Sequence, residues 1–443
     1  MTSDLDGFRI EWEWESAPSV RAPEHRATWA RIEILVGSEH VTLVEDKDSA
    51  SSRRSIYCPL YPLAEWIAYN WWLLRANSRP AIPVELLRRG SIGRQGPAWE
   101  GARRHCMRSI GDGFLWPNLL IVPEGLDTLL RWSSDEVHGP DRKIRYLSRG
   151  YRFVASAAVT YVLSGLVESV IERLRDQGVT DVPLMDEWDA IQQADDEETQ
   201  FCLAAARLGL DPYADNDLPE YGLIEAGHEL SGSLLDDFLD AVDPKRLDAG
   251  LNWVTSARSV VTESVGGRDS LLPVRDTVRA PDVSRNRPPW QIGWLQARRV
   301  REELGLAPAD PIEPAQYVTH LTRPSEDRRL QALGGTGLDN RNPTVVFGDS
   351  SNERARRFTL SRALWHFLAE DDPVFLVTAS YTHRQRVERA FAAELLAPAE
   401  GIEQRLVSEV PVEDDLEELA DHFGVSVKVV EHQLRNQLMA DSA

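Results

Sequence analysis

Four side chains in the C-terminal third of the sequence have types and spacing that could bind a metal ion. His366 and Glu370 are four residues apart in an apolar segment, so in a helix they would share one face. His383 and Glu388 come shortly before a second apolar segment and could complete the set. Imidazole nitrogens and carboxylate oxygens are typical ligands of Zn²⁺. One hypothesis is therefore a zinc centre that supports metal-assisted hydrolysis.

The two predicted helices that carry these residues resemble segments of the ImmA/IrrE family of bacterial zinc peptidases. The first contains Phe-Thr-Leu-Ser-Arg-Ala-Leu-Trp-His from Phe358 to His366, where the family has Phe-Thr-Leu-Ala leading into His-Glu-x-x-His. The second ends in Phe-Ala-Ala-Glu-Leu-Leu-Ala-Pro at Pro398, as the family does. The resemblance covers residues 290–438. Within it, the apolar spacing of Leu360, Leu364, Phe391 and Leu395 predicts that the two helices pack together and bury these side chains. The resemblance implies a small zincin-like domain whose active relatives cleave partner repressors.

The resemblance also implies positions for the zinc ligands and the catalytic base, and this sequence does not fill them. The first ligand falls on Arg362, the base on Ala363 and the second ligand on His366. The third falls on Val387, with the carboxylate of Glu388 one residue further on. A catalytic zinc needs three protein ligands and a water. We therefore interpret the region as a pseudo-peptidase without a cofactor, and keep as an alternative a metallopeptidase that uses the rearranged set above.

Arginine is unusually frequent where the metal would lie. The arginines concerned are Arg362, Arg384, Arg386 and Arg389. They could make the former cleft a receptor for an anion or an acidic peptide, because guanidinium groups bind carboxylates and phosphates through two hydrogen bonds. The other interpretation, which we favour, is that Arg362 pairs internally with Glu388 or Asp372, while Trp365 fills the emptied pocket.

Residues 416–438 have the spacing of a helix-turn-helix, with Ala420, Gly424 and Val430 at positions 0, +4 and +10. A recognition helix must bring cations to phosphates. Residues 413–435, however, contain seven acidic residues and two basic ones. DNA binding therefore stays an alternative, and a packing or partner-docking unit is the favoured interpretation.

Composition limits the class of protein. The 443 residues carry 49 Lys+Arg against 71 Asp+Glu, a formal charge of −22 that disfavours nucleic acid as the main partner. The three cysteines, Cys58, Cys106 and Cys202, are too far apart for a disulfide framework or a cysteine zinc knuckle. The first residues contain no signal-peptide pattern. We expect a cytoplasmic protein that is not membrane-bound.

Alternating apolar residues predict an antiparallel sheet near the N-terminus, with strands at residues 8–14, 30–36 and 40–44. A helix beginning at Pro62 has an aromatic and aliphatic stripe that predicts burial in the core. A further strand is predicted at residues 118–122. The fold class predicted for the whole chain is α+β.

The middle of the chain is predicted to be mainly helical. Residues 153–167 are expected to form a core helix, because the apolar run is too short for a membrane span. The acidic run 195–198 predicts a helix N-terminus in preference to a calcium site. The glycines of residues 334–337 predict a turn.

Four segments follow from these patterns. They are a module at residues 1–150, a helical region at 151–265, a linker rich in proline and glycine at 266–289, and the ImmA/IrrE-like domain at 290–438. The function predicted from the whole is a non-catalytic regulatory or interaction protein. The resemblance suggests a role in bacterial stress response, mobile-element control or phage defence, with a protein partner supplied in trans.

Overall fold

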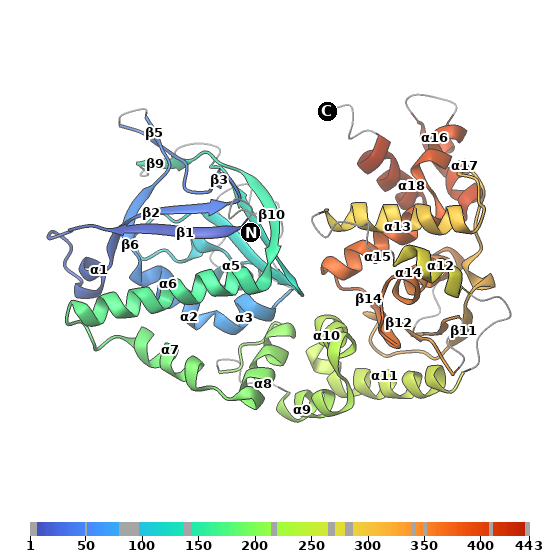
Figure 1. Cartoon of the computed structure of the whole chain (residues 1–443), viewed down its shortest axis with the longest axis horizontal. Helices are drawn as coiled ribbons and strands as arrows, with labels where there is room; N and C mark the ends of the chain where they lie inside the picture. The colour runs from blue at the N-terminus through green and yellow to red at the C-terminus, as the bar shows by residue number, and fades with distance from the viewer. Residues whose placement is uncertain are drawn as a thin grey trace. The chain divides into compact units, whose positions relative to one another are not determined.

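The computed structural model describes residues 7–48, 51–78, 97–135, 143–213, 219–264, 271–279, 287–338, 342–348, 352–406 and 411–438. The chain forms two compact units, Met1–Leu218 and Pro219–Ala443 (Figure 1). The fold is mixed α+β, as predicted. The division differs from the predicted boundary at 266–289, because residues 219–264 belong to the C-terminal unit.

The N-terminal unit is built on small antiparallel sheets. In the first, β2 (Trp29–Val36) lies between β1 (Phe8–Trp14) on one side and both β3 (Glu39–His40) and β6 (Ile56–Pro59) on the other. The second has the order β10 (Gly150–Ala155), β8 (Asp127–Ser133), β7 (Asn118–Glu124). The third has the order β5 (Ser52–Arg53), β4 (Val44–Asp46), β9 (Ile144–Tyr146).

The helices of this unit are α1 (Pro23–Ala27), α2 (Tyr61–Tyr69), α3 (Trp71–Ala76), α5 (Pro97–His105), η2 (Met107–Ser109), α6 (Ser156–Asp176), α7 (Pro183–Gln193) and α8 (Asp196–Arg207). The predicted stripe after Pro62 is buried, with Leu63 and Ile67 fully enclosed, although Asn70 divides the helix into α2 and α3. The acidic run begins α8 as predicted, and the Asp195 carboxylate accepts a hydrogen bond from the Glu198 backbone N–H at 2.9 Å.

Two predictions in this unit were wrong in part. The expected core helix at 153–167 begins only at Ser156, because residues up to Ala155 pair with β8 as strand β10. Tyr161 on that helix is also 79% exposed, so only one side of α6 is core. The expected strand at 40–44 breaks after His40, and β4 starts at Val44 to pair with another sheet. Local periodicity does not show which strand a segment will pair with.

The C-terminal unit has one four-stranded sheet in the order β11 (Thr319–Thr322), β13 (Thr344–Phe347), β12 (Leu330–Gly335), β14 (Val374–Thr378). Only β11 and β13 are parallel. Helix α14 (Glu353–Ala369) contacts β12 and β14, and α11 (Leu247–Thr262) contacts β12 and β13; the two helices lie on opposite sides of the sheet (Figure 1).

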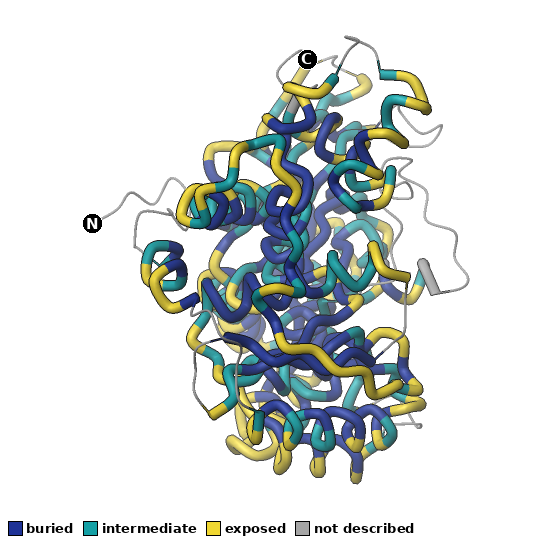
Figure 2. Tube along the Cα trace, turned by 90° about the vertical axis from the view of Figure 1, so that its right-hand side faces the viewer, coloured by how far each residue is buried: buried dark blue, intermediate teal, exposed yellow. Residues whose placement is uncertain are grey.

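The other helices of this unit are α9 (Glu220–Glu229), α10 (Gly232–Ala241), η3 (Pro244–Arg246), α12 (Leu272–Val278), α13 (Pro289–Glu303), η4 (Pro314–Gln316), α15 (His383–Leu396), α16 (Ala399–Arg405), α17 (Glu413–Phe423), α18 (Val427–Gln433) and the π-helical η5 (Leu434–Leu438). Most show one buried and one exposed side along the trace (Figure 2).

The central helices of this unit pack together as the sequence predicted. Helices α14 and α15 are in contact and bury Leu360, Leu364, Phe391 and Leu395. Helix α13 also packs closely on α15. A Cβ atom on Gly293 would lie only 2.4 Å from the backbone oxygen of a residue on α15, so glycine is required at this crossing.

The predicted linker is in part a core element. Residues 266–270 and 280–286 lie outside the described residues, but Leu272–Val278 between them form α12. Leu271, Val274 and Val278 are buried in the same core as α13 and α14. The prolines and glycines that predicted a linker are therefore found in a segment that includes a short helix packed in the core.

The predicted turn at residues 334–337 is strand in its first half. Gly334 and Gly335 end β12, and the ring of Phe375 on the neighbouring strand lies against Gly334, where a Cβ atom would be 2.4 Å from it. Glycine is present here for close packing inside the sheet. Only Gly337, with φ of +63°, has the backbone of a turn.

The turn between α17 and α18 is made by Gly424, which has a left-handed φ of 63°. Ala420 and Val430 are buried between the two helices and the rest of the unit, as the helix-turn-helix spacing predicts. Among the described residues, no helix is long and apolar enough to cross a membrane.

Candidate functional site

Helix α14 brings the first two candidate residues together. Asn352 begins the helix by accepting a hydrogen bond from the Ala355 N–H at 2.9 Å. Arg362 and His366, one turn apart, share the face that points to the sheet and α15, and their exposed fractions are 3% and 0%. Ala363, at the position of the family's base, is fully buried beside them.

Helix α15 supplies a carboxylate to the same place, and the residue is Glu388. Its side chain is fully buried and contacts both Arg362 and His366. Val387, predicted at the ligand position, is buried at the α13 crossing instead, where its backbone oxygen lies next to Gly293. Glu388, and not Val387, is therefore the residue of α15 that faces His366, because neighbouring positions differ by about 100° around a helix.

Arg362 is an internal partner of Glu388. Its Nε donates to Glu388 Oε1 at 2.9 Å, and its Nη2 donates to the same carboxylate oxygen and, at 2.6 Å, to the Thr378 carbonyl. Nη1 donates to the amide oxygen of Gln331. All three nitrogens of the guanidinium thus donate hydrogen bonds within the protein, in agreement with the interpretation that Arg362 pairs internally.

His366 is bound on both ring nitrogens by carboxylates. Nε2 lies 2.5 Å from Glu388 Oε2, and Nδ1 lies 3.2 Å from Glu370 Oε2. Its ring stacks on Phe375 with centroids 4.9 Å apart. Burial and the Arg384 charge lower the pKa of His366, but Glu388 and Glu370 outweigh them and leave the pKa above its usual value.

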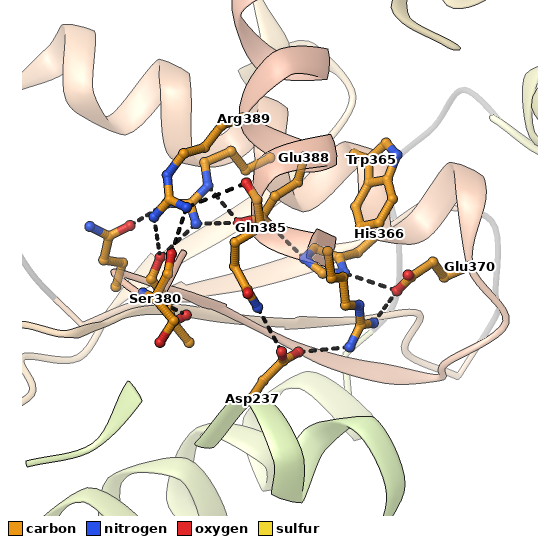
Figure 3. Close-up of polar contacts among 12 residues, drawn as sticks. Asp237, Trp365, His366, Glu370, Ser380, Gln385, Glu388 and Arg389 are labelled. Atoms are coloured by element: carbon orange, nitrogen blue, oxygen red, sulfur yellow. Dashed lines mark hydrogen bonds and ion pairs between the residues drawn. The ribbon is translucent and has the colours of Figure 1, made fainter. Parts of the chain in front are cut away.

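A third helix, α10, which lies outside the region of resemblance, also contributes a carboxylate to this cluster. Asp237 on α10 accepts hydrogen bonds from Arg384 Nη1 at 2.7 Å and from Gln385 Nε2 at 2.6 Å. Figure 3 shows Asp237 extending from its helix toward Gln385, with Glu370 and His366 in the same cluster. Burial raises the pKa of Asp237 to about 6, although Arg384 and His366 pull it down.

Arg384 connects this helix to the end of α14. It donates to Glu370 and, at 2.7 Å, to Asp372 Oδ2, which also accepts a hydrogen bond from Ser233 on α10 at 2.7 Å. Asp372, proposed as a partner for Arg362, pairs with Arg384 instead. Burial would raise the pKa of Glu370, but His366 and Arg384 hold it at about 2.

The remaining basic residues of α15 do not form an open basic wall. Arg389 donates to the carbonyls of Ser380 at 2.6 Å and Thr378 at 3.1 Å, and burial lowers its pKa to about 10. Arg386 lies over the ring of Tyr381, 5.5 Å from the centroid. The predicted receptor for anions is thus not supported by Arg362, Arg384 or Arg389, because each is engaged within the protein.

Trp365 occupies a different place from the one predicted. Its ring is 5% exposed and its Nε1 donates to Gln296 Oε1 on α13 at 2.7 Å. It meets His366 edge-on, with centroids 4.8 Å apart, and points away from the hydrogen-bonded cluster (Figure 3). The space that Trp365 was expected to fill is taken by the Arg362–Glu388 pair.

The donor set does not fit the zinc centre that the resemblance implies. A guanidinium has no lone pair for a metal, and here it covers one oxygen of Glu388 while His366 covers the other. His383 begins α15 and lies roughly 140° around the helix from Glu388. Across the described ranges, no group of three or more His, Cys, Asp or Glu side chains is placed to hold a metal ion.

Comparison with known families identifies the part of the chain that holds this cluster. Residues 325–435 match the family model described as the IrrE N-terminal-like domain, Peptidase_M78. This region is an ImmA/IrrE-like domain. The match includes β12, β13, α14, β14 and α15, which hold the Arg362–His366–Glu388 cluster, and it ends after α18. A comparison with curated proteins found no match.

Within the ImmA/IrrE-like domain, the helix-turn-helix-like pair is docked on α15. Gln433 on α18 is 2% exposed and donates to Glu394 Oε2 at 2.7 Å. Arg298 on α13 donates to the other oxygen of that carboxylate, also at 2.7 Å. Most of the acidic residues counted in residues 413–435 belong to α17. This packing supports a structural or docking role for the pair.

Sequence reasoning missed the contribution of α10. Asp237 lies between Leu234, Phe238 and Ala241 at helical spacing, so it occupies the apolar side of an amphipathic helix. A lone carboxylate on such a side indicates a buried cationic partner. That signal was available, but it could not identify Arg384 as the partner.

Proposed function

We propose that this protein is a non-catalytic regulatory or interaction protein whose C-terminal unit is an ImmA/IrrE-like pseudo-peptidase. The observation that carries the proposal is the buried ion pair between Arg362 and Glu388, which replaces a ligand and its metal with a fixed cation. The pair joins two helices and a strand of the fold, so its role is structural.

The chemistry of peptide hydrolysis supports the same conclusion. A metallopeptidase needs a metal-bound water and a group that accepts its proton. Ala363 has a methyl group at the base position, and the imidazole of His366 is already bound on both nitrogens. We infer that this site has no residue to hold a water-activating metal through His366 and none at position 363 to accept the proton of that water.

The proposed partner is a protein supplied in trans. Active relatives of the ImmA/IrrE family act on repressors, which suggests that this chain binds a repressor or a component of a stress-response, mobile-element or defence system. The overall charge of −22 supports a protein partner over nucleic acid.

The proposal can be tested by metal analysis and by restoring the family's residues. Purified protein should contain far less than one zinc per chain and have no peptidase activity. Because Glu388 already lies beside His366, the double change Arg362→His with Ala363→Glu should supply the missing ligand and base and bind one zinc.

The matched control is Arg362→His alone, which restores the ligands but lacks the base and should bind zinc without activity. Stoichiometric zinc in the unaltered protein, or peptidase activity lost on Glu388→Gln, would overturn the proposal in favour of the rearranged metallopeptidase. Salt-dependent binding to duplex DNA would favour the DNA-binding alternative instead.

A further inference from the structure

Strand β1 forms one edge of its sheet in the N-terminal unit. Its residues from Phe8 to Trp14 all pair antiparallel with β2, and the register has no bulge. Among the described residues, no strand pairs with the other side of β1. Natural proteins often protect such an edge with a proline, a bulge or an inward-pointing charge, because an open edge binds other strands. Strand β1 has none of these three.

The backbone groups of β1 alternate between β2 and the open edge. The Gly37 N–H donates to the Gly7 carbonyl at 2.8 Å, and the Glu15 N–H donates to the Trp29 carbonyl at 2.9 Å, so the odd-numbered residues bond to β2. The N–H and C=O groups of the even-numbered residues are therefore directed to the open edge. Within the described ranges, these groups make no backbone hydrogen bond to another segment. They belong to Phe8, Ile10, Trp12 and Trp14.

The aromatic side chains on the inner face of β1 are incompletely covered. Trp12 and Trp14 pack against the core of the unit but stay half-buried. Their rings meet edge-on with centroids 6.3 Å apart, and the guanidinium carbon of Arg173 lies 5.4 Å from the centroid of the Trp14 ring. A strand added to this edge would bring a further row of side chains next to both tryptophans and remove apolar area from water.

The charges on the outer face of β1 indicate which strand fits this edge. Arg9, Glu11 and Glu13 lie there, and the side chains of Glu11 and Glu13 are 60% and 68% exposed. Arg9 pairs with Glu11 of its own strand at 3.4 Å. If two copies of β1 run antiparallel about Ile10, Arg9 of each copy also lies directly opposite Glu11 of the other. Opposite charges in such cross-strand positions stabilise the pairing of strands. The charge pattern of β1 is therefore complementary to itself.

The same register satisfies the backbone. With Ile10 opposite Ile10 of the second copy, Phe8 lies opposite Trp12, and these residues carry the N–H and C=O groups of the open edge. Each opposed pair can therefore exchange two hydrogen bonds, and the pair of Phe8 with Trp12 adds a favourable aromatic contact. A register centred on Glu11 would place two glutamates opposite each other, which is unfavourable.

We propose that the open edge of β1 binds β1 of a second copy of this chain, so that the two sheets join into one antiparallel sheet across a two-fold axis at Ile10. Because the contact is only one strand wide, the dimer is weak, with a dissociation constant of about 10–100 µM. The inference does not depend on the function proposed for the C-terminal unit.

The test is sedimentation equilibrium of the full chain at pH 7 and low salt, at concentrations from about 1 to 500 µM. The average mass should rise with concentration toward that of two chains. Hydrogen exchange resolved to single amides would show which surface is used. The N–H groups of Phe8, Ile10 and Trp12 should exchange quickly in dilute protein and become protected in the dimer. Those of Arg9 and Glu11, which bond to β2, should be protected at both concentrations.

Charge exchange between two positions tests the pairing itself. Arg9→Glu should raise the dissociation constant at least about tenfold, because two opposite-charge pairs become like-charge pairs. The double change Arg9→Glu with Glu11→Arg should return it to within about threefold of the original value. Arg405→Glu, at an exposed position of α16, makes the same change in net charge and should have little effect. Thermal melts would establish that all three variants are folded.

Four outcomes would each overturn the proposal. They are a chain that stays monomeric at about 500 µM, a dimer in which the N–H groups of Phe8, Ile10 and Trp12 stay unprotected, equal dissociation constants for Arg9→Glu and Arg405→Glu, and a double change that dimerises no better than Arg9→Glu. The second of these outcomes would mean that a different surface makes the dimer.

Discussion

Carboxylates gather in two regions of this molecule, and their surroundings differ. In the C-terminal unit, Glu388, Glu370 and Asp237 each contact an arginine or a histidine within the fold. In the N-terminal unit, Glu187 and Asp211 line a cavity whose described lining contains no basic residue. A buried carboxylate that is paired with a cation of its own chain stabilises the fold, whereas the charged form of Glu187 is disfavoured by burial and by the neighbouring charge of Asp211. In the region that resembles an enzyme, the carboxylates are thus paired within the fold.

The largest expected effect is that of Arg362→Ala. It leaves Glu388 buried without its strongest partner, and loss of one member of a buried ion pair costs about 3–5 kcal/mol. We expect that decrease in the free energy of unfolding, measured by urea denaturation. Hydrogen exchange of α14 peptides would assign the transition to the C-terminal unit, because a two-unit chain need not unfold in one step.

The control for this variant is Arg354→Ala on the same helix, whose partner Asp421 is exposed. An exposed pair contributes about 0–1 kcal/mol. The double variant Arg362→Met with Glu388→Gln should be less destabilised than Arg362→Ala, because no unpaired charge remains. Equal effects of Arg362→Ala and Arg354→Ala would mean that the pair is not structural.

A smaller and pH-dependent loss of stability is expected for His366→Gln. Because the pKa of His366 is raised in the folded protein, its contribution is complete below the unfolded value and is lost as the pH rises through the folded value. The free energy of unfolding of the unaltered protein should therefore exceed that of the variant by about 1.5–3 kcal/mol near pH 6. The difference should shrink at alkaline pH.

Urea denaturation of both proteins across a pH series would measure this difference. His228→Gln, at an exposed position of α9, should show no such trend. If the free energies of unfolding of the unaltered protein and His366→Gln differed by the same amount at every pH, the imidazole of His366 would not be charged in the folded protein.

The smallest effect is expected at the cavity. Glu187→Gln should leave stability unchanged or raise it by less than about 0.5 kcal/mol, because the charge it removes is repelled by Asp211 but partly screened by solvent. Differential scanning calorimetry would detect the change. A clear loss of stability would show that Glu187 has a structural partner, and would remove the contrast with Arg362.

Much of the C-terminal architecture could be predicted from the sequence. The apolar spacing of Leu360, Leu364, Phe391 and Leu395 predicted two helices that pack together, and they do. The pairing of Arg362 with Glu388 was one of two named alternatives. Helical periodicity specifies a face, and residues on facing sides meet when the helices pack.

Other features depend on contacts that local patterns do not contain. Counting back from Phe391 placed the family's third ligand position at Val387, whereas the carboxylate that reaches His366 is that of Glu388, because a count from a motif does not show which side of a helix faces the site. The cavity was missed entirely, since Tyr69, Glu187 and Tyr213 are far apart in sequence and join only through packing. The division at Leu218 and Pro219 was not predicted, because the longer segment at 266–289, rich in proline and glycine, was the stronger linker candidate by composition.

Helix α11 has a practical consequence for anyone who works with part of this chain. The family match begins at residue 325, yet α11 buries Val254 and Val261 against the sheet, and Trp253 donates to the Arg323 carbonyl at 2.7 Å. A fragment cut at the family boundary would expose this apolar sheet face to water and favour aggregation. A fragment that begins at Pro219 keeps both α10 and α11, and is the shorter piece of this chain that we expect to be expressed in soluble form.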